Sequence, residues 1–261
     1  MENAVKTRLS GGGQGNLSSL SAIRAELKNL SKGFTLAEVL ITLGIIGIVA
    51  AMTMPAVINN TRNKQLETSL KKAYSILAQV TQRVVVEDMG GVLDVDNAKD
   101  LSTYFVKYYK NGSVCRGTDK KTGCPNSGGT GSNFCTFMMN TYKTFNGKPK
   151  AACVGNDAMS NTIDNTTIYF DKAGEGEGEA TTGKILMAVD VNGWQKNPNR
   201  WGHDIFMFQI TKSGKLLPMG ADDTSYPVDT YCSLTSTSST NGYGCTIKAL
   251  NDKEYFKNLP K

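Results

Sequence analysis

The longest apolar stretch of the chain is an uncharged run of twenty residues from Val39 to Ile58. Each residue of an α-helix adds about 1.5 Å, so this run spans about 30 Å, the hydrocarbon thickness of a bilayer. Glu38 stands directly before the run, where an unpaired carboxylate in hydrocarbon is expensive and requires a partner or a role. The pattern therefore predicts a membrane-spanning helix with one carboxylate at its head.

A second apolar pattern continues the same helix past the uncharged run. Its positions recur at alternating spacings of four and three residues, which places them on one helical face. They are Leu66, Leu70, Ala73, Leu77, Val80 and Val84. We expect one helix over residues 34–88, ended by Gly90 and Gly91, because glycine supplies the terminating backbone conformation. This face should pack on a globular head, while an independent coiled coil is less favoured because the pattern is short.

The rest of the chain shows patterns of a small mixed head. Residues 98–109 have apolar positions at helical spacing, and residues 111–155 are rich in Gly, Ser, Thr, Asn and Lys, which predicts little regular structure. Runs of β-branched and aromatic residues separated by Gly or Asn-Pro breaks predict strands. These runs are 166–171, 184–191, 204–211 and, more briefly, 215–218. Because turns rather than helices separate them, we expect an antiparallel sheet and an α+β fold.

The first 33 residues are polar and contain nothing that could build a core, so we interpret them as a leader that is removed. They carry three of the six net positive charges of the chain. Under the positive-inside bias this end stays in the cytoplasm and the remainder is translocated. The remaining charge of +3 is small and scattered, and it gives no reason to predict nucleic-acid binding.

The segment Gly33-Phe34-Thr35-Leu36-Ala37-Glu38-Val39-Leu40 resembles the processing site of type IV pilins and type II secretion pseudopilins. The resemblance implies that a prepilin peptidase cuts after Gly33 and methylates the new N-terminal Phe34, leaving Glu38 as the fifth mature residue. It extends through the positions that loosen the helix in that family and fades near Arg62. Those positions are Gly44, Gly47 and Pro55.

The function implied by the resemblance is that of a non-enzymatic filament subunit. Its domains would be a leader (1–33), a long helix (34–88) with a transmembrane and assembly segment (34–58), and an extracytoplasmic head (89–261). Its partners would be copies of itself, other pilin-like subunits, the prepilin peptidase, inner-membrane assembly machinery and, before assembly, the lipid bilayer. It would reside in the inner membrane with its N-terminus in the cytoplasm and then enter a filament. Major pilin, minor pilin and pseudopilin remain open.

Two other interpretations of the same segment are less favoured. A secretory signal peptide cut after Ala50-Ala51 fits poorly, because a glutamate and a long polar stretch precede its apolar region. A single-pass anchor carrying an extracytoplasmic binding domain that does not polymerise explains the hydrophobicity but leaves Glu38 and the Gly33-Phe34 junction unexplained. The N-terminal residue of the mature protein distinguishes these two interpretations from the prepilin interpretation.

All six cysteines follow the membrane segment, in the part that would be exported. An oxidising compartment makes disulfides the expected state. They are Cys115, Cys124, Cys135, Cys153, Cys232 and Cys245. Pairing of sequence neighbours is favoured because short loops close first, although the sequence leaves the connectivity open. The Cys232 to Cys245 loop also resembles the disulfide-bounded C-terminal loop of many pilins.

Catalytic and metal sites find little support in the sequence, and we predict no cofactor. The single histidine, His203, lies before a predicted strand with no local nucleophile, and we expect an exposed loop residue. Cysteine spacings do not match a zinc site. The stretch from Asp190 to Asp204 is rich in oxygen ligands and some pseudopilins are similar in holding calcium in a late loop. Side-chain-capped turns are the favoured interpretation.

Overall fold

The computed structural model of the protein describes residues 33–93, 98–108, 113–116, 133–154, 158–162, 164–172 and 184–260. The chain divides after Ala56 into two compact units. The first contains the apolar beginning of the long helix, and the second, from Val57 onward, contains the rest of that helix and the globular head.

The long helix α2 (Leu36–Arg83) passes directly into a π-helical turn, η1 (Val84–Asp88). It ends as predicted, since Gly90 and Gly91 have φ angles of 68° and 95° and the Gly91 amide donates to the Val85 carbonyl at 2.8 Å. The predicted apolar face is buried at every position. Packing on the head, rather than coiled-coil pairing, therefore accounts for the periodicity beyond the uncharged run.

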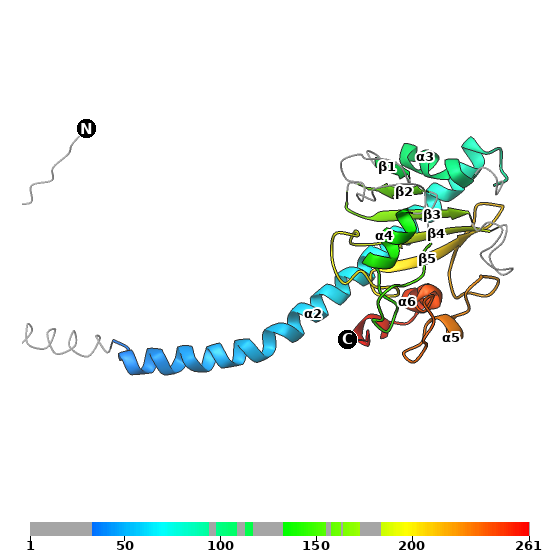
Figure 1. Ribbon diagram of the computed structural model, residues 1–261. Helices are drawn as coiled ribbons and strands as arrows, with labels where there is room; N and C mark the ends of the chain where they lie inside the picture. The colour runs from blue at the N-terminus through cyan, green and yellow to red at the C-terminus, as the bar shows by residue number, and fades with distance from the viewer. Residues whose placement is uncertain are drawn as a thin grey trace, which may run out of the picture. The chain divides into compact units, whose positions relative to one another are not determined.

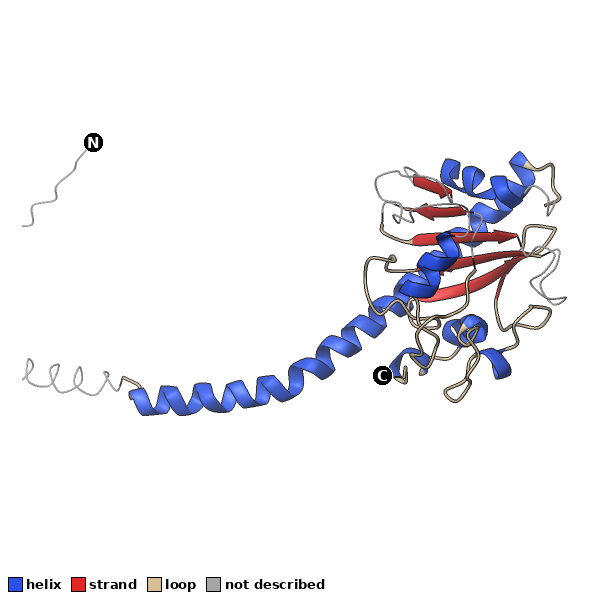
Figure 2. Ribbon diagram, viewed as in Figure 1, coloured by secondary structure: helices blue, strands red, loops and turns tan. Residues whose placement is uncertain are grey.

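The head is built on one antiparallel sheet in which each strand pairs with its neighbours in sequence (Figure 2). Its strands are β1 (Ser113–Arg116), β2 (Ala158–Asn161), β3 (Thr167–Lys172), β4 (Ile185–Asp190), β5 (Ile205–Ile210) and β6 (Leu216–Pro218). The four predicted strands correspond to β3, β4, β5 and β6. The predicted α+β fold class is confirmed: a long apolar helix packs on an antiparallel sheet.

Helices lie on both faces of the sheet (Figure 1), and each face is covered by a separate apolar cluster. On one face lie α2 from Leu66 onward and α3 (Ala98–Tyr108), whose Phe105 ring meets Phe170 of β3 at 5.1 Å between centroids. On the other lie α4 (Asn133–Thr141) and a group of aromatic residues that includes Trp201. Because both faces are covered, β4 and β5 are buried at every position.

The prediction of little regular structure over residues 111–155 is wrong in two places. β1 pairs with β2, which places Cys115 opposite Met159, and α4 buries Met138 against the sheet. Both elements are fixed by contacts with distant parts of the chain, so tertiary packing overrides the loop-like composition. Short helical segments also follow the sheet: α5 (Val228–Tyr231), η3 (Tyr243–Cys245), α6 (Thr246–Asn251) and η4 (Tyr255–Lys257).

Two disulfides join the loops around the second cluster and the C-terminal segment. Cys135 pairs with Cys153 and Cys232 pairs with Cys245, the sequence-neighbour pairing that we favoured. Cys115 is also disulfide-bonded. The remaining cysteine, Cys124, lies outside the described residues.

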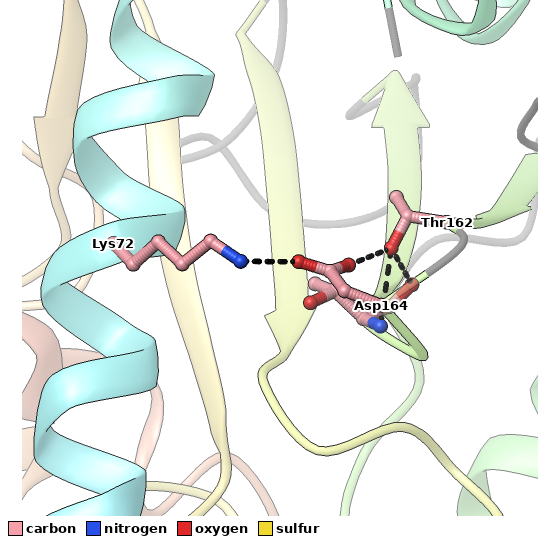
Figure 3. Close-up of polar contacts among 4 residues, drawn as sticks. Lys72, Thr162 and Asp164 are labelled. Carbon is pink, nitrogen blue, oxygen red and sulfur yellow. Dashed lines mark hydrogen bonds and ion pairs between the residues drawn. The ribbon is translucent and has the colours of Figure 1, made fainter. Parts of the chain in front are cut away.

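Polar contacts attach α2 to the turns at the edge of the head. The Lys72 ammonium contacts Asp164 Oδ2 at 2.9 Å, and Asp164 also accepts a hydrogen bond from the Thr162 hydroxyl in the β2–β3 turn (Figure 3). Arg62 donates to the Asn197 carbonyl in the loop between β4 and β5. Since Lys72 and Asp164 are both substantially exposed, these contacts add less stability than the buried apolar face.

Candidate processing and assembly site

The junction predicted for cleavage is accessible in the structure. Gly33 lies three residues before the first helical residue, Leu36, and a Cβ added at Gly33 would meet no atom of the described residues within 4 Å. The Phe34 side chain is 88% exposed. A peptidase could reach the bond between these residues without unfolding the helix that follows.

Thr35 and Glu38 form a reciprocal capping box at the start of α2. The Glu38 amide donates to Thr35 Oγ1 at 3.2 Å, while Glu38 Oε2 accepts from the Thr35 amide at 2.9 Å and from its hydroxyl at 2.8 Å. Such a box satisfies backbone donors that the first helical turn leaves unpaired. It uses no atom before Thr35, so it can persist in a chain that begins at Phe34.

This capping box was not among the predicted features, although the chain carries its signature at Thr35 and Glu38. A threonine followed three residues later by glutamate, directly before an apolar run, is the sequence signature of a capping box. The Glu38 side chain therefore caps the first turn of α2, in addition to the assembly role that the family resemblance implies. Among the described residues, Thr35 provides its only hydrogen-bond donors.

No residue of the apolar segment beyond this box is buried. The structure describes one helix long and apolar enough to cross a membrane, Leu36–Asp88, and its most apolar window is 0% buried. A Cβ added at Gly44 or Gly47 would meet no atom of the described residues within 4 Å, and Pro55 lies inside the helix. The hydroxyls of Thr42 and Thr53 donate to carbonyls one turn earlier, at 2.9 Å each. Every side-chain donor here is satisfied within the helix, as a lipid environment or a bundle of helices requires.

A family model describing a prokaryotic N-terminal methylation motif matches residues 28–54. The chain carries the signature of type IV pilins and pseudopilins. The match covers Lys28 and Lys32 before Gly33, the capping box and most of the apolar run. Neither the curated proteins nor the solved structures yielded a match to the chain. The motif supports a processed, pilin-like subunit whose first helix is held in a membrane before it enters an extracytoplasmic filament.

The oxygen-rich loop between β4 and β5 is organised by two buried carboxylates. Asp190 accepts from the Gly193 amide at 2.8 Å and the Tyr142 hydroxyl at 2.6 Å, and Asp204 accepts from the Asn199 and Arg200 amides at 2.8 and 2.7 Å. Burial raises the pKa of Asp190 well above its usual range and that of Asp204 to about 6. The favoured interpretation as side-chain-capped turns is confirmed.

The expectation that His203 is exposed is wrong. Its side chain is 5% exposed and lies against the Phe145 ring at 5.7 Å between centroids. Burial, together with the nearby Arg200 guanidinium, lowers the pKa of His203 to about 3. The neutral imidazole is therefore part of the packed head. Its loop position before β5 gave no signal of this burial, because the covering residues come from distant parts of the chain.

Proposed function

We propose that the protein is a structural subunit of a type IV pilus or type II secretion pseudopilus. In this proposal the prepilin peptidase removes residues 1–33, and the mature chain assembles through residues 34–58. The observation that carries the proposal is the coincidence of an accessible Gly33-Phe34 junction, a capping box and a fully exposed apolar helix within one methylation motif.

Cleavage would create an ammonium group at Phe34, four residues before Glu38. In the bilayer that amine can be neutralised by its own carboxylate or by headgroups. In a filament the apolar helices bundle away from water, and an unpaired carboxylate there would be destabilising. Thr35 donates only to Oε2, so Oε1 of Glu38 can accept from the amine of a neighbouring subunit. This pairing would fix the axial position of one subunit against the next.

Two substitutions separate the pairing role from the capping role. Glu38→Gln keeps an acceptor oxygen for Thr35 but removes the charge, whereas Glu38→Ala removes both. If pairing between subunits controls assembly, both variants should insert and be cleaved like wild type yet be recovered in sheared filaments at a much lower fraction of total membrane protein.

Thr35→Ser is the matched control, because serine can form the same box without changing charge. Normal filament entry by Glu38→Gln together with failure of Glu38→Ala would assign the requirement to capping and contradict the pairing account. Normal entry by both would remove any assembly role for Glu38. A processed wild-type protein that never enters filaments would instead favour the membrane-anchored binding domain.

A further inference from the structure

A small pocket opens on the head where two turns come together. It has a volume of about 180 Å³ and lies between the β2–β3 connection and the loop that follows β4. Four amide side chains line it: Asn161, Asn165, Asn192 and Gln195. Thr167, Trp194 and Lys196 complete the lining around Gly193. None of these residues belongs to the methylation motif.

The two turns that form the pocket are each fixed by contacts with neighbouring residues. Gly193 has a φ of 86°, and a Cβ at this position would lie 2.2 Å from the Asn165 carbonyl oxygen, so only glycine allows the turns to approach this closely. Asp190 holds the Gly193 amide, and the Lys72–Asp164 contact fastens the opposite turn to α2 (Figure 3). The pocket is therefore largely preformed, which limits the ordering required for binding.

The pocket chemistry selects one class of ligand. Amide side chains both donate and accept, and no carboxylate lines the pocket, which disfavours a metal ion. The Asn192 Oδ1 atom is buried and has no hydrogen-bond partner among the described residues. Trp194 offers an aromatic surface, and the Phe137 ring contacts it edge-on at 5.2 Å between centroids. Neighbouring donors and acceptors beside an aromatic ring match a molecule with vicinal hydroxyls and an apolar C–H face.

We propose that this pocket binds one hexose unit of a saccharide. Its volume is below the roughly 300–1,000 Å³ of drug-sized sites, which suits a single ring. Ring hydroxyls would pair with the amides of Asn192 and Gln195, and the C–H face would lie on Trp194. The ammonium of Lys196 adds a contact for a carboxylated sugar. This proposal does not depend on filament assembly, because every residue that lines the pocket lies in the head.

Intrinsic fluorescence tests the proposal on the full mature chain in a detergent without a sugar headgroup. The chain has two tryptophans, and Trp201 is 0% exposed, so acrylamide quenching reports on Trp194. The probes are glucose, galactose, N-acetylglucosamine, N-acetylgalactosamine and glucuronic acid. We expect at least one of them to protect Trp194 saturably, with a Kd below about 10 mM.

Gln195→Ala should weaken that binding about tenfold, the effect of losing one hydrogen-bonding group. The matched control is Gln65→Ala, which removes another exposed amide from the surface of α2 and should leave the affinity unchanged. Unaltered emission in saturating acrylamide, which quenches Trp194 and leaves buried Trp201, verifies that each variant is folded. The proposal is overturned if none of the five sugars protects Trp194, or if the two substitutions weaken binding equally.

Discussion

Replacing the buried histidine should change the pH dependence of stability in a defined direction. His203 has a folded-state pKa of about 3, below the usual value near 6.5. The unfolded chain therefore takes up the proton first as pH falls. The stability that comes from keeping His203 neutral is complete above about pH 6.5 and is lost progressively between pH 6.5 and 3.

The magnitude follows from these two pKa values. At pH 5 the preferential protonation of the unfolded state should lower the free energy of unfolding by about 2 kcal/mol relative to pH 8. Asp204 acts in the opposite sense: its pKa is raised to about 6, so protonation of the folded state restores about 1 kcal/mol between pH 7 and pH 5. The pKa of Asp190 is also raised by burial, so its protonation acts in the same sense as that of Asp204. Wild type should therefore show a profile in which His203 is opposed by these two carboxyl groups.

His203→Phe removes the histidine contribution and leaves those of Asp190 and Asp204. The chain has a single histidine, so no other imidazole complicates the comparison. Urea unfolding of the mature protein in detergent, followed through the emission of buried Trp201, should show the variant gaining about 2 kcal/mol over wild type as pH falls from 7 to 5. Parallel profiles for the two proteins would refute the argument, whatever their difference at pH 7.

Two further predictions concern what holds the head together. Replacing Cys232 and Cys245 by serine opens a loop of sequence separation 13 and should destabilise the head by about 3 kcal/mol in urea unfolding; an unchanged midpoint would contradict a structural role for this disulfide. Lys72→Met removes the exposed pair with Asp164 and should cost at most about 1 kcal/mol, whereas Leu70→Ala, at a fully buried position, should cost about 2–5 kcal/mol. A larger loss for Lys72→Met would show that the ion pair, rather than apolar packing, attaches α2 to the sheet.

The parts of the fold that the sequence predicted are those with a strong local signal. The spacing from Leu66 to Val84 follows from helical geometry alone, and Gly90 and Gly91 end the helix because glycine adopts positive φ readily. Strands β3, β4 and β5 carry β-branched and aromatic residues between clear turn signals. Each of these elements is encoded within a few neighbouring residues.

The features that sequence reasoning missed depend on contacts between distant residues. β1 exists because it pairs with β2 more than forty residues later, and His203 is buried because Phe145 and other distant residues cover it. The pocket beside Gly193 likewise requires Asn165 from another turn. The capping box is different, because Thr35 and Glu38 lie three residues apart and their signature was readable. The charge of Glu38 predicts a partner for the carboxylate, whereas the spacing from Thr35 to Glu38 predicts the capping box.

The N-terminus of the protein isolated from membranes of its native host tests the central claim most directly. Peptide mass spectrometry should identify a mature chain that starts at Phe34 and carries one N-methyl group, and Gly33→Ala, which leaves the helix and its capping box intact, should abolish this species. A chain that starts at Met52 would identify an ordinary signal peptide, and an intact chain starting at Met1 would identify an uncleaved anchor. Either result would contradict processing at the Gly33-Phe34 junction.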